Sequence, residues 1–315
     1  MDGRFEAGQW AVILGGSSGF GLASAQALAE RGMNLCLIHR DRRALLAAIE
    51  PEFEKLRQVG VEVRTFNTDA LSGDKRDAVL DELARIFGES GRVRVLLHSI
   101  AFGNLKLLTP EAPVERTSVA ALAKKLGSET EKVQAALDEL FAEGAEAVHA
   151  LASPPAYSDK HFLDEDDFSR TIHAMGTSLL GWVQGIFNRG LFATDARVFG
   201  LTSEGNEVAW KGYAAVAAAK VALESLARSI ALEYAPFGIR CNVIQAGITE
   251  TPALAAIPGS DHMKAQARIR NPFHRLTTPR DVANVIALLA TDEAAWINGE
   301  VIRVDGGEHI SGATQ

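Results

Sequence analysis

The sequence predicts an α/β fold with a Rossmann-like, doubly wound parallel sheet of about seven strands. Three observations predict this class: short apolar runs that are nearly continuous, amphipathic helical stretches that alternate with them, and a glycine-rich segment directly after the first run. Unbroken apolar runs are typical of strands that helices cover on both faces of a parallel sheet. We therefore interpret residues 1–315 as a single domain.

Seven short apolar runs are the expected strands of this sheet. They are Trp10–Leu14, Asn34–His39, Val61–Phe66, Val93–His98, Ala196–Leu201, Arg240–Ala246 and Glu300–Val304. Between them, apolar residues recur at the spacing of an amphipathic helix. The expected helices are Gly19–Glu30, Asp41–Val59, Lys75–Phe87, Asp167–Asn188, Tyr213–Tyr234 and Pro279–Thr291. Each strand is thus joined to the next through a helix, as a doubly wound fold requires.

One stretch breaks this alternation, because no strand is expected between Asn104 and Asp166, whereas such a connection normally takes a handful of residues. Four prolines flank it: Pro110, Pro113, Pro154 and Pro155. Between the prolines, Ser118–Leu126 and Glu129–Leu151 carry apolar residues at helical spacing. We interpret residues 104–165 as a helical hairpin that is inserted into the domain.

Composition and charge exclude several classes of function. The chain has 40 Asp and Glu against 32 Lys and Arg, and this acidic balance argues against nucleic acid as a partner. It shows no charged-then-apolar leader and no long apolar run, so we expect neither a signal peptide nor a membrane span, and a cytoplasmic location. The eight histidines show no metal-ligand spacing, so no metal site is expected. Cys36 and Cys241 lie within apolar strands and are expected to be buried free thiols.

The segment Leu14–Gly21 is the strongest local signal for function. Its glycines let the backbone turn tightly and approach a pyrophosphate, and the helix that begins there offers free N–H groups and the positive end of its dipole. Such a loop alone could equally be a structural turn, but its place between the first strand and an amphipathic helix favours a dinucleotide site. The expected contacts are Gly15, Ser17, Ser18, Gly19, Phe20 and Gly21.

The residues after the second strand indicate which dinucleotide is bound. An acidic residue there would hold the ribose hydroxyls of NAD, whereas an arginine accommodates the 2′-phosphate of NADP. Arg40 comes before Asp41, which favours NADPH over NADH. Alternatively, Asp41 only caps the next helix and the arginines form a solvated face. Asp69 and Ala70, after the third strand, are the expected adenine contacts, although Asp69 could equally cap a turn.

Tyr213 and Lys220 lie on the helix after the fifth strand and carry the catalytic signal. Residues at this spacing lie about two turns apart on the same helix face, so the phenol and the ammonium can converge on one cofactor. A lysine near a phenol lowers the pKa of the phenol and favours donation to a developing oxyanion. The alternative is an unrelated Tyr and Lys on an amphipathic helix, but Tyr157 and Tyr234 are not similarly placed.

These motifs together resemble the short-chain dehydrogenase/reductase superfamily, and they occur in the order of that family. The resemblance rests on the glycine pattern of residues 15–21, on Asp69, on Tyr213 and Lys220, on residues 242–251 and on residues 304–307. It covers nearly the whole chain except the insertion.

Several details are similar to the enoyl-acyl-carrier-protein reductase branch of that superfamily. Tyr213 and Lys220 are seven residues apart, whereas the commoner carbonyl-reducing members use a spacing of four, where this chain has Ala217. After the fourth strand, residues 98–103 are similar to the Ser-Ile-Gly/Ala-Phe segment of enoyl reductases. Met175 or a neighbour stands where carbonyl reducers usually hold a catalytic asparagine.

The resemblance implies roles for further residues. The implied cofactor contacts are Ser99, Ile100, Ala101, Lys220, Gly247, Ile248 and Thr251. The implied lining of the substrate pocket is Phe102, Met175 and Tyr213. Leu14 and Ala246 depart from the usual Thr and Pro of the family. Ser203 stands where many enoyl reductases have a second tyrosine; it would bind the substrate carbonyl as a catalytic residue, or only satisfy the loop backbone.

The function that these features imply is NADPH-dependent reduction of a 2-enoyl thioester in fatty acid or polyketide metabolism. Hydride would go to Cβ, and Tyr213 would stabilise the enolate. The substrate would be a small-molecule acyl thioester, on coenzyme A or on a carrier protein. The first alternative is a carbonyl reductase that acts on a 3-oxoacyl thioester or another ketone. The second is a non-catalytic NADP-binding protein.

Three larger segments carry expectations of their own. Glu250–Pro272 would close over the acyl chain as a lid. Tyr213–Tyr234 shows more apolar surface than one sheet face requires, which predicts a homo-oligomer, a tetramer by analogy with the family. The insertion could be a wall of the acyl pocket, a docking surface for a carrier or an oligomer contact. Its acidic charge disfavours docking to an acidic carrier, so the pocket wall is favoured.

Overall fold

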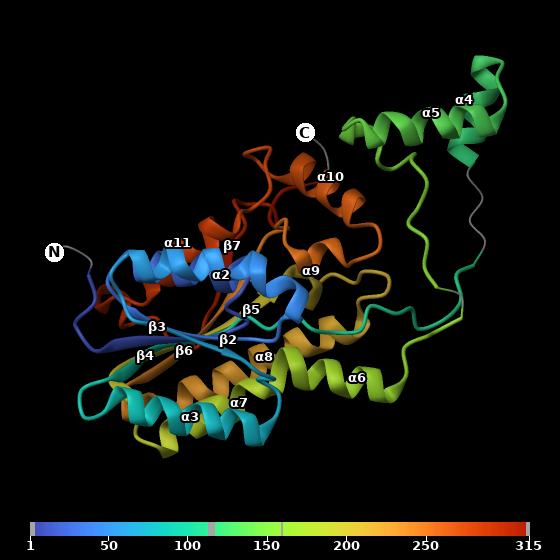
Figure 1. Ribbon diagram of the computed structural model, residues 1–315. Helices are drawn as coiled ribbons and strands as arrows, with labels where there is room; N and C mark the ends of the chain where they lie inside the picture. The colour runs from blue at the N-terminus through green and yellow to red at the C-terminus, as the bar shows by residue number, and fades with distance from the viewer. Residues whose placement is uncertain (1–3, 113–116, 159, 313–315) are drawn as a thin grey trace.

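The computed structural model describes residues 4–112, 117–158 and 160–312. Seven parallel strands form one sheet in the order β3-β2-β1-β4-β5-β6-β7 (Figure 1). They are β1 (Gln9–Leu14), β2 (Asn34–His39), β3 (Val63–Asn67), β4 (Arg92–His98), β5 (Phe192–Ser203), β6 (Ile239–Ala246) and β7 (Val301–Val304). The strand order reverses between β1 and β4, and ligands bind at such a switch point in open α/β sheets. The predicted fold class is confirmed.

Helices cover both faces of the sheet (Figure 1). One face packs against α1 (Gly19–Ala29), α2 (Arg43–Gln58) and α11 (Pro279–Leu289). The other packs against α3 (Gly73–Phe87), α7 (Ser178–Asn188) and α8 (Ala214–Glu233). Within β1, Ala11 and Ile13 belong to the first of these cores, whereas Val12 and Leu14 belong to the second. Every position of the strand is therefore buried, and this is why its sequence is continuously apolar.

The segment predicted as one helix over Asp167–Asn188 is longer and contains an irregular turn. It consists of α6 (Glu165–Ile172), a π-helical turn η2 (His173–Thr177) and α7, which follow one another without a break. Asp164 caps α6, because its side chain accepts a hydrogen bond from the backbone N–H of Asp167 at 2.7 Å. π-Turns inside helices often occur at functional sites.

The predicted insertion is a helical hairpin that extends away from the sheet (Figure 1). It contains α4 (Thr117–Leu126), α5 (Thr130–Ala142) and a short 3₁₀ turn, η1 (Glu146–Val148). Its own small core is Val119, Ala123, Val133 and Leu137. The second helix ends earlier than predicted because Gly144, with φ of +99°, adopts the left-handed conformation that ends helices.

The predicted lid segment contains two short helices, α9 (Pro252–Ala255) and α10 (Ser260–Arg270). The remaining 3₁₀ turns are η3 (Glu204–Asn206), η4 (Ala235–Phe237) and η5 (Asp292–Ala294). Among the described helices, none is long and apolar enough to cross a bilayer.

The two cysteines lie in separate parts of the sheet. Cys36 is in β2 and Cys241 in β6, and β1, β4 and β5 lie between these strands. Both side chains are buried free thiols, as predicted, and burial raises the pKa of each.

Three arginines meet at Asp195, near the amino-terminal edge of the sheet. Its carboxylate accepts hydrogen bonds from Arg94, Arg197 and Arg240. Arg94 and Arg197 are almost completely buried and also donate to the backbone carbonyls of residues 289–291 at the end of α11. Cations at a helix carboxyl terminus satisfy its free carbonyls and oppose its dipole. This cluster therefore attaches α11 to β4, β5 and β6.

Candidate active site

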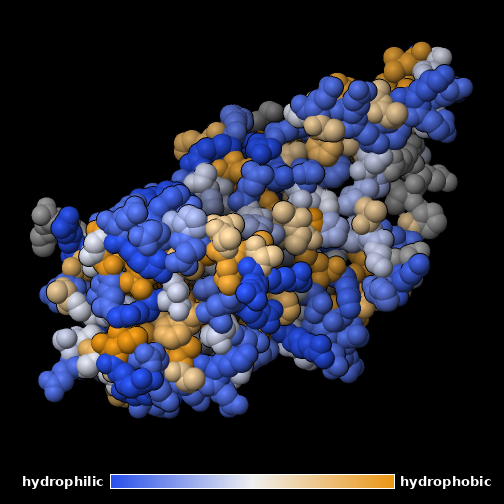
Figure 2. Space-filling model, in the orientation of Figure 1, coloured by the Kyte–Doolittle hydropathy of each residue, from blue (hydrophilic) through white to orange (hydrophobic). Residues whose placement is uncertain are grey.

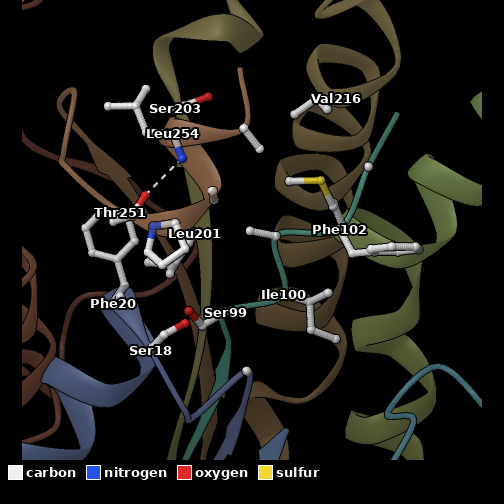
Figure 3. Close-up of a pocket in the computed structure, with 18 of the residues that line it drawn as sticks. Ser18, Phe20, Ser99, Ile100, Phe102, Leu201, Ser203, Val216, Thr251 and Leu254 are labelled. Atoms are coloured by element: carbon white, nitrogen blue, oxygen red, sulfur yellow. Dashed lines mark hydrogen bonds between the residues drawn. The ribbon is translucent and has the colours of Figure 1, made fainter. Parts of the chain in front are cut away.

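A cavity of about 530 Å³ opens at the carboxyl-terminal edge of the sheet. Its walls come from the segments that follow β1 to β6, so it spans the switch point between β1 and β4. Ser18 and Phe20, from the start of α1, lie on the opposite side of the pocket from Val216 on α8 (Figure 3). The fold therefore gathers the predicted site residues around one cavity.

The glycine-rich loop is shaped by two close approaches of the backbone. Gly15 has φ of +85°, and a Cβ there would overlap the carbonyl oxygen of Ser99. A Cβ at Gly21 would overlap the carbonyl oxygen of Gly15, so only glycine fits at both places. Gly21 packs behind the loop and does not line the cavity. The lining residues of the loop are Gly15, Ser17, Ser18, Gly19 and Phe20.

Arg40 lies at the end of β2, where the sequence places the adenosine ribose. Its guanidinium is exposed; Nη1 is 3.4 Å from Asp69 Oδ2, and Cζ lies 4.6 Å from the centre of the Phe102 ring. Asp41 also lines the cavity, and its Oδ2 is 2.8 Å from Nδ1 of His39. Phe102, assigned to the substrate pocket from sequence, lines the cavity with its ring against Arg40.

Tyr213 and Ser203 bring two hydroxyls together in the cavity wall. Tyr213 immediately precedes α8, and its Oη is 3.4 Å from the Oγ of Ser203 at the end of β5. The ring fits there because residue 205 is glycine, since a Cβ on Gly205 would meet the Tyr213 ring. Burial raises the pKa of Tyr213, so the expectation that Lys220 lowers it is wrong, and the phenol stays protonated at neutral pH. Two hydroxyl donors therefore face the same part of the cavity.

Lys220 lies two turns into α8 and lines the same cavity. Its side chain is 6% exposed, and Nζ donates a hydrogen bond to the carbonyl oxygen of Leu201 at 2.8 Å. Burial lowers the pKa of Lys220 to about 8. The ammonium therefore remains protonated at pH 7, as a buried positive charge in the wall of the cavity that Tyr213 and Ser203 also line.

The segment after β4 and the π-turn form another wall. Ser99, Ile100 and Ala101 line the cavity, as does Met175 from the π-turn. Behind them, Nε2 of His98 lies 2.8 Å from Ser178 Oγ, and Ser178 in turn donates to the carbonyl of residue 174. Burial lowers the pKa of His98 to about 3, so its imidazole is neutral.

The segment after β6 crosses above the glycine-rich loop. Gly247, Ile248 and Thr251 line the cavity, and Thr251 Oγ1 accepts a hydrogen bond from Leu254 N–H at 3.2 Å, which starts α9 (Figure 3). Glu308 holds this segment from below, because its carboxylate accepts from Ile248 N–H at 3.2 Å. Burial raises the pKa of Glu308 to about 7, and the nearby Glu204 carboxylate acts in the same direction.

Apart from Gly21, every predicted site residue lines the cavity, including Asp69 and Ala70 after β3. Sequence reasoning did not single out several other lining residues: Leu105, Glu204, Trp210, Val216 and Met263. Met263 lies in the predicted lid and Val216 on the predicted catalytic helix, so position gave a partial signal for both. Trp210 and Glu204 lie in the loop between β5 and α8, which carries no regular pattern.

Two family models match this chain. Residues 127–309 match the model described as Enoyl-(Acyl carrier protein) reductase, and residues 9–118 match the model described as short chain dehydrogenase.

Two similar proteins cover nearly the whole chain. The cis-4-hydroxycyclohexanecarboxylate dehydrogenase of Sinomonas cyclohexanicum is 27% identical over 297 residues, which are 94% of this chain and 95% of the relative. The probable 2,4-dienoyl-CoA reductase of Bacillus subtilis is 28% identical over 304 residues, which are 95% of this chain and 96% of the relative. One relative is thus named as an alcohol-oxidising enzyme and the other as a reductase of an unsaturated thioester.

Solved structures show the same fold. An enoyl-(acyl-carrier-protein) reductase from Anaplasma phagocytophilum, in complex with NAD, superposes with a TM-score of 0.67 at 18% identity, covering 99% of this chain and 95% of that chain. A short-chain type dehydrogenase/reductase from Mycobacterium ulcerans superposes with a TM-score of 0.71 at 21% identity, covering 98% and 92%. At these identities the likeness concerns the fold alone.

Proposed function

This chain belongs to the short-chain dehydrogenase/reductase superfamily as an NAD(P)-dependent oxidoreductase, and we propose that it reduces 2-enoyl thioesters with NADPH. The observation that carries this proposal is the arrangement of Tyr213 and Lys220. They are seven residues apart, as in enoyl reductases, and both line one cavity next to the Ser203 hydroxyl. The residue four positions after Tyr213 is Ala217, so no lysine stands at the spacing of the carbonyl reducers.

The cavity fits a dinucleotide phosphate cofactor. The overlaps that a Cβ would make at Gly15 and Gly21 keep the loop at the start of α1 in the close turn that a pyrophosphate needs. Arg40 supports NADPH rather than NADH, because its exposed guanidinium is a charge-assisted donor suited to a 2′-phosphate. Its pairing with Asp69 is long enough, at 3.4 Å, to be exchanged for a phosphate. When bound, NADPH supplies the hydride for Cβ of the substrate.

The chain's own groups act on the charge that develops at the thioester oxygen. Tyr213 donates a hydrogen bond to this oxygen, and because its pKa is raised by burial it donates as a neutral phenol. An oxyanion donor of this kind contributes about 2.7–4 kcal/mol to transition-state stabilisation. Lys220 keeps the surrounding potential positive and binds ribose hydroxyls of the cofactor. A proton taken from water then adds to Cα, so that the enolate becomes the saturated thioester.

Ketone reduction is the second candidate, and one observation favours it. The Oγ of Ser203 lies 3.4 Å from the Tyr213 hydroxyl, and a serine and a tyrosine that converge in this way can polarise a carbonyl oxygen. Met175 argues against this reading, because it lines the cavity with an apolar thioether and, by the resemblance, it or a neighbour stands where carbonyl reducers usually hold an asparagine.

One assay distinguishes the candidates. Oxidation of NADPH would be followed at 340 nm with crotonyl-coenzyme A, with acetoacetyl-coenzyme A and without substrate, and each would be repeated with NADH. We expect turnover with crotonyl-coenzyme A and NADPH that is lost in Tyr213→Phe. Turnover with acetoacetyl-coenzyme A alone would establish the ketone reductase instead, and no turnover with either would contradict both.

We also propose that the protein is a homotetramer. Val221 on α8 is 48% exposed, and Leu180 on the adjoining α7 is 36% exposed, so apolar side chains remain on the outer face of this helix pair. Sedimentation velocity at micromolar concentration tests the proposal, and a monomer would contradict it.

A further inference from the structure

The insertion contacts the surroundings of the cavity at two places. Glu111 and Tyr157 contact Lys211 in the loop before α8, and the segment after α5 contacts the helix α10. Leu105, at the start of the insertion, lines the cavity, but no described residue of the segment 106–160 does, so the expectation that the helical hairpin is a pocket wall is not supported. Instead α10 faces two ways. Met263 lines the cavity, whereas His262 and Arg268 contact the hairpin.

His262 is the centre of this contact. Its Nδ1 lies 3.0 Å from the carbonyl oxygen of His149, and its Nε2 lies 3.0 Å from the carbonyl oxygen of Ser153. The imidazole also packs on the Phe141 ring, with 4.7 Å between the ring centres. Because both carbonyls belong to the segment after α5, one side chain of α10 holds the base of the hairpin at two points.

Two further contacts reinforce the same junction. Arg268, near the end of α10, forms an ion pair with Glu146 in η1. A Cβ on Gly259, at the start of α10, would collide with the ring of Pro155, so the hairpin segment packs directly against the helix start. The hairpin therefore meets α10 at its N-cap, in its first turn and near its end.

The hairpin can act as a support for α10. Its helices are held together by their own apolar core, and its surface over α4 and α5 is mostly hydrophilic in the view of Figure 2. α10 itself contributes only Ala265 and Ala267 as fully buried apolar side chains. A helix with so little buried apolar surface needs further contacts to remain in place.

We propose that His262 and Glu146 are positioning residues, through which the inserted hairpin holds α10, and with it Met263, against the substrate side of the cavity. The proposal rests on the thioester reductase function for its substrate readout. Loss of these contacts would weaken binding of the acyl thioester and leave cofactor binding unchanged, because the hairpin touches none of the described segments around the glycine-rich loop or Arg40.

Kinetics of three variants test the substrate readout. His262→Leu keeps the packing on Phe141 but removes both hydrogen bonds, and Glu146→Gln removes only the ion pair. We expect each to raise KM for crotonyl-coenzyme A about fivefold or more, with KM for NADPH changed less than about twofold. Glu143→Gln, an exposed change on the same hairpin, is the matched control and should change neither.

Hydrogen–deuterium exchange provides a readout that needs no substrate. In His262→Leu and in Glu146→Gln, amides of residues 260–270 should exchange faster than in the unmodified protein, while those of α8 keep their protection. Unchanged exchange in α10, or an equal rise of KM for crotonyl-coenzyme A and for NADPH, would overturn the proposal. If the unmodified protein showed no thioester turnover but α10 exchanged faster in the two variants, the proposed function would be contradicted. The positioning of α10 by His262 and Glu146 would still be supported.

Discussion

Replacing Lys220 by methionine should stabilise the cofactor-free protein while it abolishes activity. The ammonium is buried, and this burial lowers its pKa from the ordinary 10.5 to about 8. At about 1.36 kcal/mol for each pH unit, the buried charge costs the folded state about 3.4 kcal/mol at pH 7. Methionine removes that cost and loses the hydrogen bond to Leu201, which contributes about 1 kcal/mol. The free energy of unfolding should therefore increase by about 2 kcal/mol.

The sign of the pH dependence follows from proton linkage. The unfolded chain keeps Lys220 protonated up to its ordinary pKa, whereas the folded protein releases the proton from about pH 8. Between these values the unfolded state binds more protons, so stability of the unmodified protein rises with pH. The advantage of Lys220→Met should accordingly be complete below pH 8 and lost above about pH 10.5.

Urea-induced unfolding without cofactor, followed by tryptophan fluorescence at pH 7 and pH 10, measures this effect. Lys75→Met, at an exposed position of α3, is the matched control and should change the free energy of unfolding little. In the same samples, NADPH-dependent turnover by Lys220→Met should be absent. A variant that is less stable at pH 7, or one whose gain does not depend on pH, would refute the argument that burial penalises this charge.

Three further substitutions have expected outcomes. Tyr213→Phe should lower kcat about 10²–10³-fold while the Kd for NADPH, measured by fluorescence titration, changes little, because the hydroxyl acts on transition-state charge. Arg40→Ala should raise KM for NADPH about tenfold or more and leave KM for NADH nearly unchanged, and equal losses would make Arg40 structural. Asp195→Asn should lower the free energy of unfolding by about 2–3 kcal/mol in urea, since Arg94 and Arg197 stay buried without their carboxylate; an unchanged value would show that the carbonyls at the end of α11 suffice.

Much of the site follows from local sequence, because short-range geometry determines it. The turn at Gly15 and Gly21 needs residues without a Cβ, and the sequence has glycine at both positions. The apolar run of β1 needs two covered faces, and its lack of polar residues indicates this. Tyr213 and Lys220 also reach one cavity largely because a single helix separates them by two turns. The resemblance to a family added an expected role for each of these residues.

Other features depend on contacts between segments far apart in the chain, and no local pattern encodes them. Ser203 meets Tyr213, and the Phe102 ring meets Arg40, only because the parallel strands end at the same edge of the sheet. Nothing in the apolar spacing of the insertion shows that its base would be held by His262, more than 100 residues away. The sequence alone determined the class of fold and most of the residues that line the cavity, since periodicity and backbone sterics are local. Only the tertiary structure decided which groups touch, because burial and charge pairing arise when distant segments pack together.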